Sequence, residues 1–339
     1  MNLHTPLRCA GLQPKRTRVW RLRGLATALS ASLLLVSACG TSDTAEPAKP
    51  AAGGSGAPET KSLTVGYLPT ADYLPVFVAV QEGYFKEVGL EITTKVMPPG
   101  APAAATVGGS LDVGGVPWTA HLLAMDTGIP IVAVAGSTSG VPKFASYLVP
   151  NDSDIKSPAD LVGRSAAVSG SPGNCDMLLE ATLNKEGVPG RPKYVQLGAS
   201  QMEASLSKGD IEAACVPQPI QGSMLATGKY RVVFDVFGGD FQGFPLIGYN
   251  IRKSFVDQNP NTVAAFRKAI VRASDKINSD PAIVQKTLPT YTQYTADQAK
   301  NIVLPKYTPE IDRASLEKLV GILQDLKVVK NKIELPQYN

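Results

Sequence analysis

A run of small polar residues, SGSPGN at positions 169–174, directly precedes a stretch of helical character that begins at Cys175. Backbone N–H groups at a helix start lie at the positive end of the helix dipole, which is a favourable place for an oxyanion. Ser169, Ser171 and Asn174 can add side-chain donors. The run lacks the Gly-Lys-Ser/Thr that ends a phosphate-binding P-loop. It therefore indicates a site for the polar head of a small ligand or, alternatively, a capped helix start that faces water.

Residues for catalysis and for metal binding are scarce. The chain has two histidines, His4 and His121, and four cysteines. A Ser-His arrangement would depend on His121, and a zinc site of several His and Cys ligands is difficult to assemble from this set. We therefore expect no enzyme, no metal site and no cofactor.

Other polar and aromatic residues follow predicted strands. Trp118 could form an apolar wall, face a cationic group, or pack in the core. Asp72 could contact a ligand or cap the following helix, and we weigh the two equally. The predicted ligand-binding residues are Thr70, Asp72, Tyr73, Trp118, Thr119, Ser139, Ser169, Ser171, Asn174 and Gln218.

The elements that position these residues alternate along the chain. From Ser62 onward, short β-branched runs alternate with amphipathic stretches, which predicts an α/β fold with largely parallel strands. Residues 260–325 are mostly helical in pattern. The expected strands are 62–67, 90–96, 131–136, 164–168, 193–197, 211–216 and 231–236. The expected helix starts are Ser157-Pro158, Asn259-Pro260, Asp280-Pro281 and a capping box from Ser200 to Glu203.

Five segments in register carry a family resemblance. TVGYLPTADYLPVFVAVQEGYFKEVGLEI (64–92) resembles the opening of the aliphatic-sulfonate/taurine/nitrate class of periplasmic binding proteins, which includes thiamin-precursor binders. We expect Tyr84 and Phe85 to pack in the core and Gly89 to end a helix. We expect Asp112 to stabilise a turn or a cap rather than to contact a ligand. The four segments that follow in the family's order are GGSLDVGGVPWTAHLLAMDTGIPIVAVAG, SDIKSPADLVGRSAAVSGSPGN, LSKGDIEAACVPQPI and RKSFVDQNPNTVAAFRKAI.

The resemblance implies a type II periplasmic-binding-protein fold, with two mixed, mostly parallel sheets. Lobe I would hold residues 62–144 plus 246–339, and lobe II residues 145–245, with crossover strands near 144–149 and 245–251. Ligands in such sheets bind beyond the carboxyl ends of the strands, between the lobes. That rule selects the loops 69–73, 116–119, 137–140, 169–174 and 216–219.

The chemistry of these five loops limits the solute. They contain no lysine or arginine, so a charged ligand would depend on dipoles and hydroxyl groups. Many members of the resembled family carry Trp-Glu-Pro where this chain has Pro217-Gln218-Pro219, and their contacts therefore do not transfer. The loops favour a sulfonate, with an alkanesulfonate or taurine as the best guess, or a neutral heterocycle such as a thiamin-precursor pyrimidine. Nitrate is a further alternative.

The N-terminus resembles a lipoprotein leader. Residues 1–38 hold six basic and no acidic residues, and their apolar run LATALSASLLLVSA is too short to span a bilayer comfortably. The run ends in Val36-Ser37-Ala38-Cys39, which resembles a lipobox with Cys39 as the lipidated residue. The alternative is an ordinary signal peptide with a chance cysteine. Residues 39–61 have the composition of a flexible tether that reaches roughly 25 Å.

These features predict a lipid-anchored protein on the extracytoplasmic face of a membrane, either periplasmic or at the cell surface. Without the leader, 27 basic residues stand against 29 acidic ones, which excludes nucleic-acid binding by bulk charge. We expect a monomer that captures a small solute and delivers it to an ABC permease. The alternatives are a sensory receptor module and a vitamin-synthesis enzyme.

Two cysteines of lobe II follow predicted strands and border the ligand loops. In an oxidising compartment Cys175 and Cys215 could form a disulfide that closes a loop of about 40 residues. The alternative is two buried free thiols, and the sequence favours neither.

Overall fold

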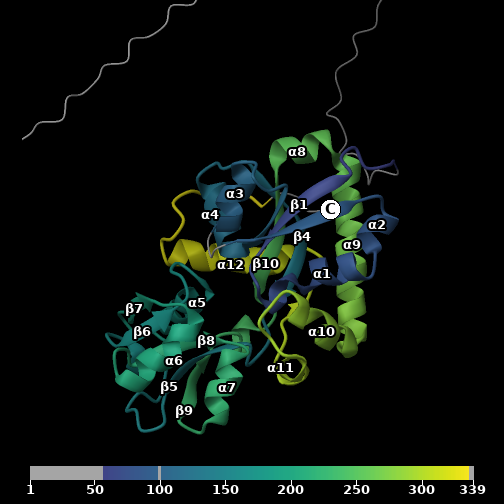
Figure 1. Cartoon of the computed structure of the whole chain (residues 1–339). Coiled ribbons are helices and arrows are strands. Elements are labelled where there is room, and N and C mark those ends of the chain that lie inside the picture. The colour runs from purple at the N-terminus through teal and green to yellow at the C-terminus, as the bar shows by residue number, and fades with distance from the viewer. Residues whose placement is uncertain (1–55, 98–100, 336–339) are drawn as a thin grey trace, which may run out of the picture. The chain divides into compact units, whose positions relative to one another are not determined.

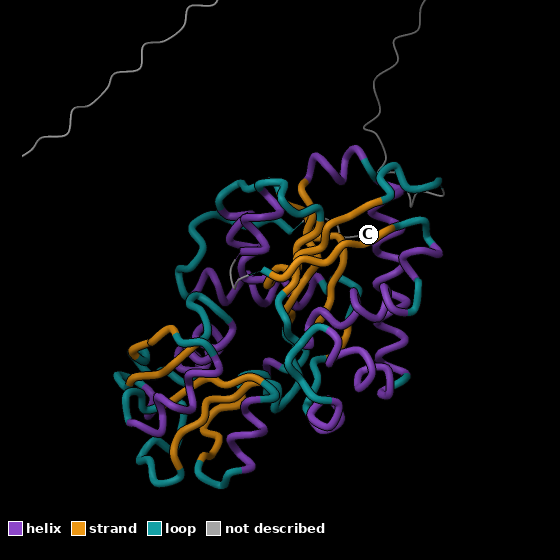
Figure 2. The backbone as a smooth tube through the Cα atoms, viewed as in Figure 1, coloured by secondary structure: helices purple, strands orange, loops and turns teal. Residues whose placement is uncertain are grey.

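The strands of the computed structural model, which describes residues 56–97 and 101–335, gather into two separate sheets (Figure 2). The first sheet has the order β11-β4-β10-β3-β1-β2, and the second has the order β7-β6-β8-β5-β9. The first sheet consists of β1 (Ser62–Tyr67), β2 (Glu91–Val96), β3 (Val113–Pro117), β4 (Ile131–Ser139), β10 (Pro245–Arg252) and β11 (Lys306–Tyr307). The second sheet consists of β5 (Ala145–Pro150), β6 (Ser165–Val168), β7 (Lys193–Gln196), β8 (Ala213–Pro217) and β9 (Tyr230–Asp235).

Both sheets are mixed. In the first, β1 pairs in parallel with β2 and β3, whereas β10 runs antiparallel to β3 and β4. In the second, β6 pairs in parallel with β7 and β8, whereas β5 runs antiparallel to β8 and β9. The predicted fold class of two mixed sheets is confirmed, and the two segments expected to cross between the sheets form the reversed strands β5 and β10.

Helices cover the first sheet (Figure 1). One buried cluster joins β1, β3, β4 and β10 to residues of α1, α2, α9 and α10. The helices around this sheet are α1 (Leu74–Gln81), α2 (Tyr84–Glu87), α3 (Ala101–Val107), α4 (Trp118–Asp126), α8 (Lys253–Gln258), α9 (Pro260–Ser279), α10 (Pro281–Thr287), α11 (Ala296–Asn301) and α12 (Arg313–Asp325).

The second sheet has its own helices. Met202, Leu206 and Met224 pack in a buried cluster against β5, β6 and β8. A larger cluster contains Trp118 and Leu319 as well as Tyr147 and Leu178, so apolar packing continues from one sheet's helices to the other's. The helices are α5 (Asn174–Lys185), α6 (Ala199–Lys208) and α7 (Ile220–Ala226). Short 3-10 turns η1 (Ala71–Tyr73), η2 (Ala159–Leu161), η3 (Gly239–Phe241) and η4 (Leu288–Thr290) complete the elements.

Most local predictions are confirmed. Each of the seven predicted strands is present, and the longest departure is β4, which continues to Ser139. Tyr84 and Phe85 are buried, and Gly89 has a left-handed φ of 79° after α2. The carboxylate of Asp112 accepts a hydrogen bond from the Thr64 N–H at 2.8 Å, which joins the start of β3 to β1.

The helix starts were predicted less well. Asp280 caps α10 by accepting from the Ala282 N–H, as expected. Ser157-Pro158 leads only into the 3-10 turn η2. The capping box at Ser200 is wrong, because Gly198 is the extended N-cap residue of α6 and Ser200 lies inside the helix. A capping box instead joins Thr295 and Gln298 at α11.

Two predictions concern the membrane. Cys39 and the residues before position 56 lie outside the described residues, so the lipid anchor stays a prediction. In the ranges 56–97 and 101–335, no helix combines the length and the apolar character that crossing a bilayer requires.

Candidate ligand-binding site

Asp72 lies in η1, directly after the loop that follows β1, at the carboxyl edge of the first sheet. Its carboxylate accepts hydrogen bonds from the Thr70 hydroxyl at 3.0 Å and from the Thr138 hydroxyl at 2.9 Å. Thr138 belongs to β4, so the carboxylate joins loops that come from two strands. Asp72 is half-buried, and desolvation raises its pKa, although both hydrogen bonds oppose that rise. This is a carboxylate held in place by hydroxyl groups.

Tyr73 has a structural position. Its side chain is fully buried, and its hydroxyl donates to the Gly115 carbonyl at 2.9 Å. The ring lies so close to Gly115 that a Cβ there would come within 2.1 Å of it. Of the two adjacent candidates, the structure therefore presents Asp72 to the edge of the sheet and places Tyr73 in the core.

Trp118 begins α4 and is 2% exposed. Its ring packs edge-to-face on His121 and against Gly248, where a Cβ would come within 2.7 Å of the indole. Burial lowers the pKa of His121 to about 4, and the neighbouring Asn250 side chain opposes this shift only in part. Thr119 is also buried. The core alternative for Trp118 is therefore the dominant one.

The indole of Trp118 nevertheless borders a cavity of about 160 Å³, which we call the Trp118 pocket. It contains both hydroxyl residues that end β4, Thr138 and Ser139. Its charged lining residues are Lys306, Glu310 and Asp312, so the described lining carries one more negative than positive charge. Lys306 was not predicted, because it lies in the C-terminal helical region and only the pairing of β11 with β4 brings it to this edge.

A second cavity of about 200 Å³, the Gln218 pocket, has Asp72 in its lining. Its lining joins the first-sheet loop to the segment after β8 in the second sheet. The Tyr294 hydroxyl donates to the Gln218 carbonyl at 3.1 Å, and the Gln218 amide donates to the Lys143 carbonyl at 3.1 Å. The lining residues are Thr70, Ala71, Asp72, Phe144, Pro217, Gln218, Tyr294, Ile302 and Val303. Asp72 is the charged residue in this group.

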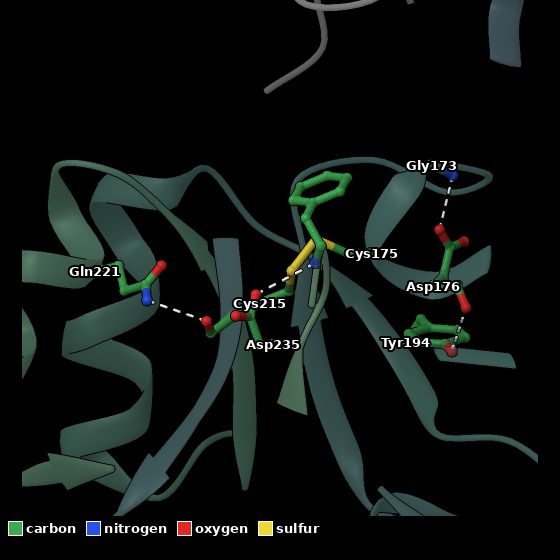
Figure 3. The surroundings of a disulfide bond; sticks show 9 residues. Gly173, Cys175, Asp176, Tyr194, Cys215, Gln221 and Asp235 are labelled. Carbon is green, nitrogen blue, oxygen red and sulfur yellow. Dashed lines mark hydrogen bonds between the residues drawn. A yellow bond between two sulfur atoms is a disulfide. The ribbon is translucent and has the colours of Figure 1, made fainter. Parts of the chain in front are cut away.

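The loop 169–174 differs from its prediction. The carboxylate of Asp176 accepts a hydrogen bond from the Gly173 N–H at 2.7 Å and another from the Ser171 hydroxyl. Figure 3 shows this carboxylate pointing back at Gly173 at the start of α5. Ser169 and Ser171 are exposed and Asn174 is half-buried, whereas Asp176 is 4% exposed. Two of the donors expected for an oxyanion are therefore used by the chain's own carboxylate.

A disulfide joins Cys175 to Cys215, with their Cα atoms 6.2 Å apart (Figure 3). The bond fastens the first turn of α5 to β8. Pro217 and Gln218, which line the Gln218 pocket, stand two and three residues after Cys215. Of the two alternatives that the sequence left open, the structure contains the bridge.

The structure thus sorts the ten predicted residues into groups. Thr70, Asp72 and Gln218 share one pocket, and Trp118 and Ser139 share the other. Ser169, Ser171 and Asn174 lie at the edge of the second sheet, and Tyr73 and Thr119 are buried. Sequence reasoning missed Asp176, although an acidic residue three positions after a glycine N-cap is a recognisable capping signal. Within the part of the chain that the structure describes, no cluster of His, Cys, Asp and Glu could hold a metal ion.

Known proteins resemble this chain over most of the region just described. A family profile described as NMT1/THI5 like matches residues 70–283. The nitrate/nitrite binding protein of Synechococcus elongatus is 26% identical over 284 residues, covering 72% of this chain and 63% of that relative. The chain therefore spans less than two thirds of that relative. The formylaminopyrimidine-binding protein of Halalkalibacterium halodurans is 23% identical over 291 residues, covering 82% of this chain and 79% of the relative.

A solved structure agrees in fold. The periplasmic aliphatic sulphonate binding protein of Escherichia coli superposes with a TM-score of 0.66 at 18% identity, covering 81% of this chain and 96% of that one. One enzyme also matches: a 4-amino-5-hydroxymethyl-2-methylpyrimidine phosphate synthase of Saccharomyces cerevisiae is 26% identical, covering 65% of this chain and 67% of the synthase. These matches confirm the sulfonate, taurine and nitrate resemblance, and the choice between binding protein and enzyme rests on the site.

Proposed function

This chain belongs to the NMT1/THI5-like family, and we propose that it is the solute-binding component of an ABC importer, which captures a small organic solute outside the cytoplasm. One observation carries the proposal: the Gln218 pocket is lined by the loop after β1 and by the segment after β8. In α/β proteins, small ligands bind in pockets that the carboxyl ends of strands face. Here such strand ends come from two sheets.

The charges of the two pockets favour one class of solute. The Gln218 pocket contains Asp72, and the Trp118 pocket contains Glu310 and Asp312 beside a single lysine. Among the described residues Asp72 forms no salt bridge, and its partners are the hydroxyl groups of Thr70 and Thr138. An anionic solute would meet net negative charge. We therefore favour a neutral or cationic solute with N–H donors, such as an aminopyrimidine, over the alkanesulfonate or taurine that the sequence first suggested.

A thermal-shift screen tests this choice. A solute present at a hundred times its dissociation constant adds about 2.7 kcal/mol to the free energy of unfolding, which raises the melting temperature measurably. We expect stabilisation by 4-amino-5-hydroxymethyl-2-methylpyrimidine and none by taurine, methanesulfonate or nitrate. Stabilisation by an oxyanion alone would overturn the proposed class and restore the sulfonate hypothesis.

The rival functions require different chemistry. A vitamin-synthesis enzyme needs a reactive histidine or lysine in the pocket, and the described lining of the Gln218 pocket contains neither. Incubation with the aminopyrimidine should return it unchanged. A sensory module would capture solute in the same way, so reconstitution with the permease and ATPase decides between transport and sensing. Solute-stimulated ATP hydrolysis supports the importer, and its absence favours a sensor.

The anchor belongs to the same proposal. A solute-binding protein of an importer must stay near its permease, and a lipidated Cys39 followed by a tether would keep it there. We expect Cys39→Ala to leave a folded protein that fractionates with the soluble material. Tight membrane retention of this variant would contradict lipidation at Cys39.

Closure around the solute is the remaining part of the proposal. The chain passes between the two sheets from β4 to β5 and from β9 to β10, and rotation about these segments would enclose a solute while few residues change conformation. Small-angle scattering should give a smaller radius of gyration with saturating solute. An unchanged radius with a bound solute would contradict closure.

A further inference from the structure

One hydrogen bond joins two residues of the Gln218 pocket that belong to different sheets. The Tyr294 hydroxyl donates to the Gln218 carbonyl at 3.1 Å, and both residues line the pocket. Tyr294 packs against the buried cluster of the first sheet, whereas Gln218 directly follows β8 of the second. Building on the proposed solute-binding function, we propose that Tyr294 is a clasp residue: its hydrogen bond holds the two sides of the pocket together and slows the exit of the solute.

The donor is held in place on the side of the first sheet. The Tyr294 N–H donates to the Thr292 hydroxyl at 3.2 Å, and the next residue, Thr295, starts α11 with a capping box to Gln298. Desolvation raises the pKa of Tyr294, and the charge of Asp72 adds to this rise. The hydroxyl therefore keeps its proton at neutral pH and remains a donor in a fixed position.

The acceptor is held in place on the side of the second sheet. Gln218 follows β8, which pairs with β5. The Gln218 N–H donates to the Phe144 carbonyl at 3.0 Å, and its side-chain amide donates to the Lys143 carbonyl at 3.1 Å, so both contacts lead to the residues that precede β5. Because neither partner can follow the other, the two sides of the pocket cannot separate at this point unless the bond of Tyr294 breaks.

The surroundings of the bond make its rupture relevant to the solute. Asp72, which the proposed function assigns to solute recognition, lines the same pocket. Tyr294 and Gln218 are both half-buried. The remaining lining is mostly apolar and includes Ala71, Phe144, Pro217, Ile302 and Val303. In apolar surroundings water competes poorly for a hydrogen bond, so the clasp favours a closed pocket and a departing solute must wait for it to open.

The chain offers a matched control in Tyr291, three residues earlier. Its hydroxyl donates to the Thr70 carbonyl at 3.2 Å, and it is half-buried like Tyr294. Tyr291 packs against the cluster of the first sheet, and Thr70 follows β1 of that sheet, so this bond stays on one side of the pocket. Tyr291→Phe therefore removes a hydrogen bond of the same kind without releasing the second sheet, and it preserves the stacking of the ring on Phe77.

The test measures how fast a bound solute leaves the wild-type protein, Tyr294→Phe and Tyr291→Phe. Each protein is loaded with radiolabelled 4-amino-5-hydroxymethyl-2-methylpyrimidine and then mixed with an excess of the unlabelled compound. We expect Tyr294→Phe to release the label about two- to tenfold faster than the wild type, the range that one neutral hydrogen bond contributes. Tyr291→Phe should release it at the wild-type rate. An exit rate of Tyr294→Phe equal to that of the wild type would overturn the inference, and so would an equal acceleration in Tyr291→Phe.

A second measurement does not depend on the solute. Nitroxide labels on Lys300→Cys in α11 and Ala226→Cys in α7, both exposed positions, report the separation of the two sides by pulsed electron paramagnetic resonance in the Cys39→Ala protein. We expect Tyr294→Phe to raise the ratio of long to short distances about two- to tenfold and Tyr291→Phe to leave it unchanged. If the aminopyrimidine does not bind, this ratio decides. An unchanged ratio in Tyr294→Phe overturns the clasp, whereas a raised ratio supports it and the failed binding counts against the proposed function alone.

Discussion

Two aspartates, Asp72 and Asp176, follow strands of different sheets, and the chain holds them in different ways. Asp72 is held by hydroxyl groups from its own loop and from β4, which lies 66 residues away in sequence. Asp176 is held by its own loop, through Gly173 and Ser171. The first carboxylate therefore depends on the assembled sheet, whereas the second is a local cap that a covalent bond at the adjacent Cys175 anchors to β8.

The difference indicates separate roles for the two edges. At the first-sheet edge, Asp72 lies in a pocket with acceptor capacity still open to a solute, since a carboxylate can accept about four hydrogen bonds. At the second-sheet edge, Asp176 uses its charge to satisfy the helix start. We infer that the first edge recognises the solute, whereas the carboxylate at the second edge caps α5. Four predictions test this comparison.

Trp118→Ala should have the largest effect, and it should act on stability. Because the indole is buried against His121 and Gly248, its removal leaves a cavity and costs about 3–5 kcal/mol of unfolding free energy. Trp118→Phe keeps an aromatic ring and should cost less. Chemical denaturation measures both. A Trp118→Ala protein of unchanged stability but lost affinity would make Trp118 a ligand wall rather than a core residue.

Removal of the disulfide should weaken the second-sheet edge alone. The bond closes a loop of 40 residues, and the chain-entropy account gives about 4 kcal/mol as the upper limit of its contribution. We expect Cys175→Ala/Cys215→Ala to unfold at lower denaturant concentration and to keep most of its affinity for the solute. Two free thiols in the unfolded, unreduced mature protein, besides Cys39, would show that the bridge does not form.

Lowering the pH should reduce the free energy of unfolding through His121, which packs against the first sheet. Its pKa is about 4 in the fold and 6.5 in the unfolded chain, so the unfolded chain binds the proton more readily. The neutral His121 therefore contributes its full stability above pH 6.5. This contribution is lost as the pH falls from 6.5 through 4, and at pH 4 the loss of unfolding free energy is about 3 kcal/mol. His121→Leu should abolish this part of the pH dependence, because other titrating groups are common to both proteins. Parallel curves for the two proteins would refute it.

Asp72→Asn should reduce affinity more than stability. A hydrogen bond to a charged group contributes about 1.5–3 kcal/mol, so we expect a ten- to hundredfold loss of affinity for an N–H-bearing solute. Thr138→Val removes only the hydroxyl that positions the carboxylate, and its loss should be smaller. Calorimetry on the two variants compares them. Equal affinity of Asp72→Asn and the wild type for the solute would show that Asp72 does not contact it, and would contradict a binding site at the first-sheet edge.

The two edges also differ in how far the sequence could foresee them. The polar run at 169–174 and its place after a strand were readable, because strands and helix starts are encoded by neighbouring residues. The same local pattern allowed two outcomes, a site for the polar head of a ligand or a capped helix start. Asp176 decides between them within a few residues, so closer attention to capping would have found it. The position of Lys306 in the Trp118 pocket and the hydrogen bond of Thr138 to Asp72 could not be foreseen, since no local signal links residues so far apart.

The sequence by itself determined the alternation of strands and helices, the family, and the loops in which polar groups gather. Those properties follow from the period of apolar residues and from the composition of short segments. Only the tertiary structure decided that Trp118 and Tyr73 are core residues, that Asp72 remains available at a pocket, and that Cys175 meets Cys215. The physical reason is that burial and pairing depend on which distant segments pack together. β10, for example, is inserted between β3 and β4, where its Gly248 leaves room for the indole of Trp118.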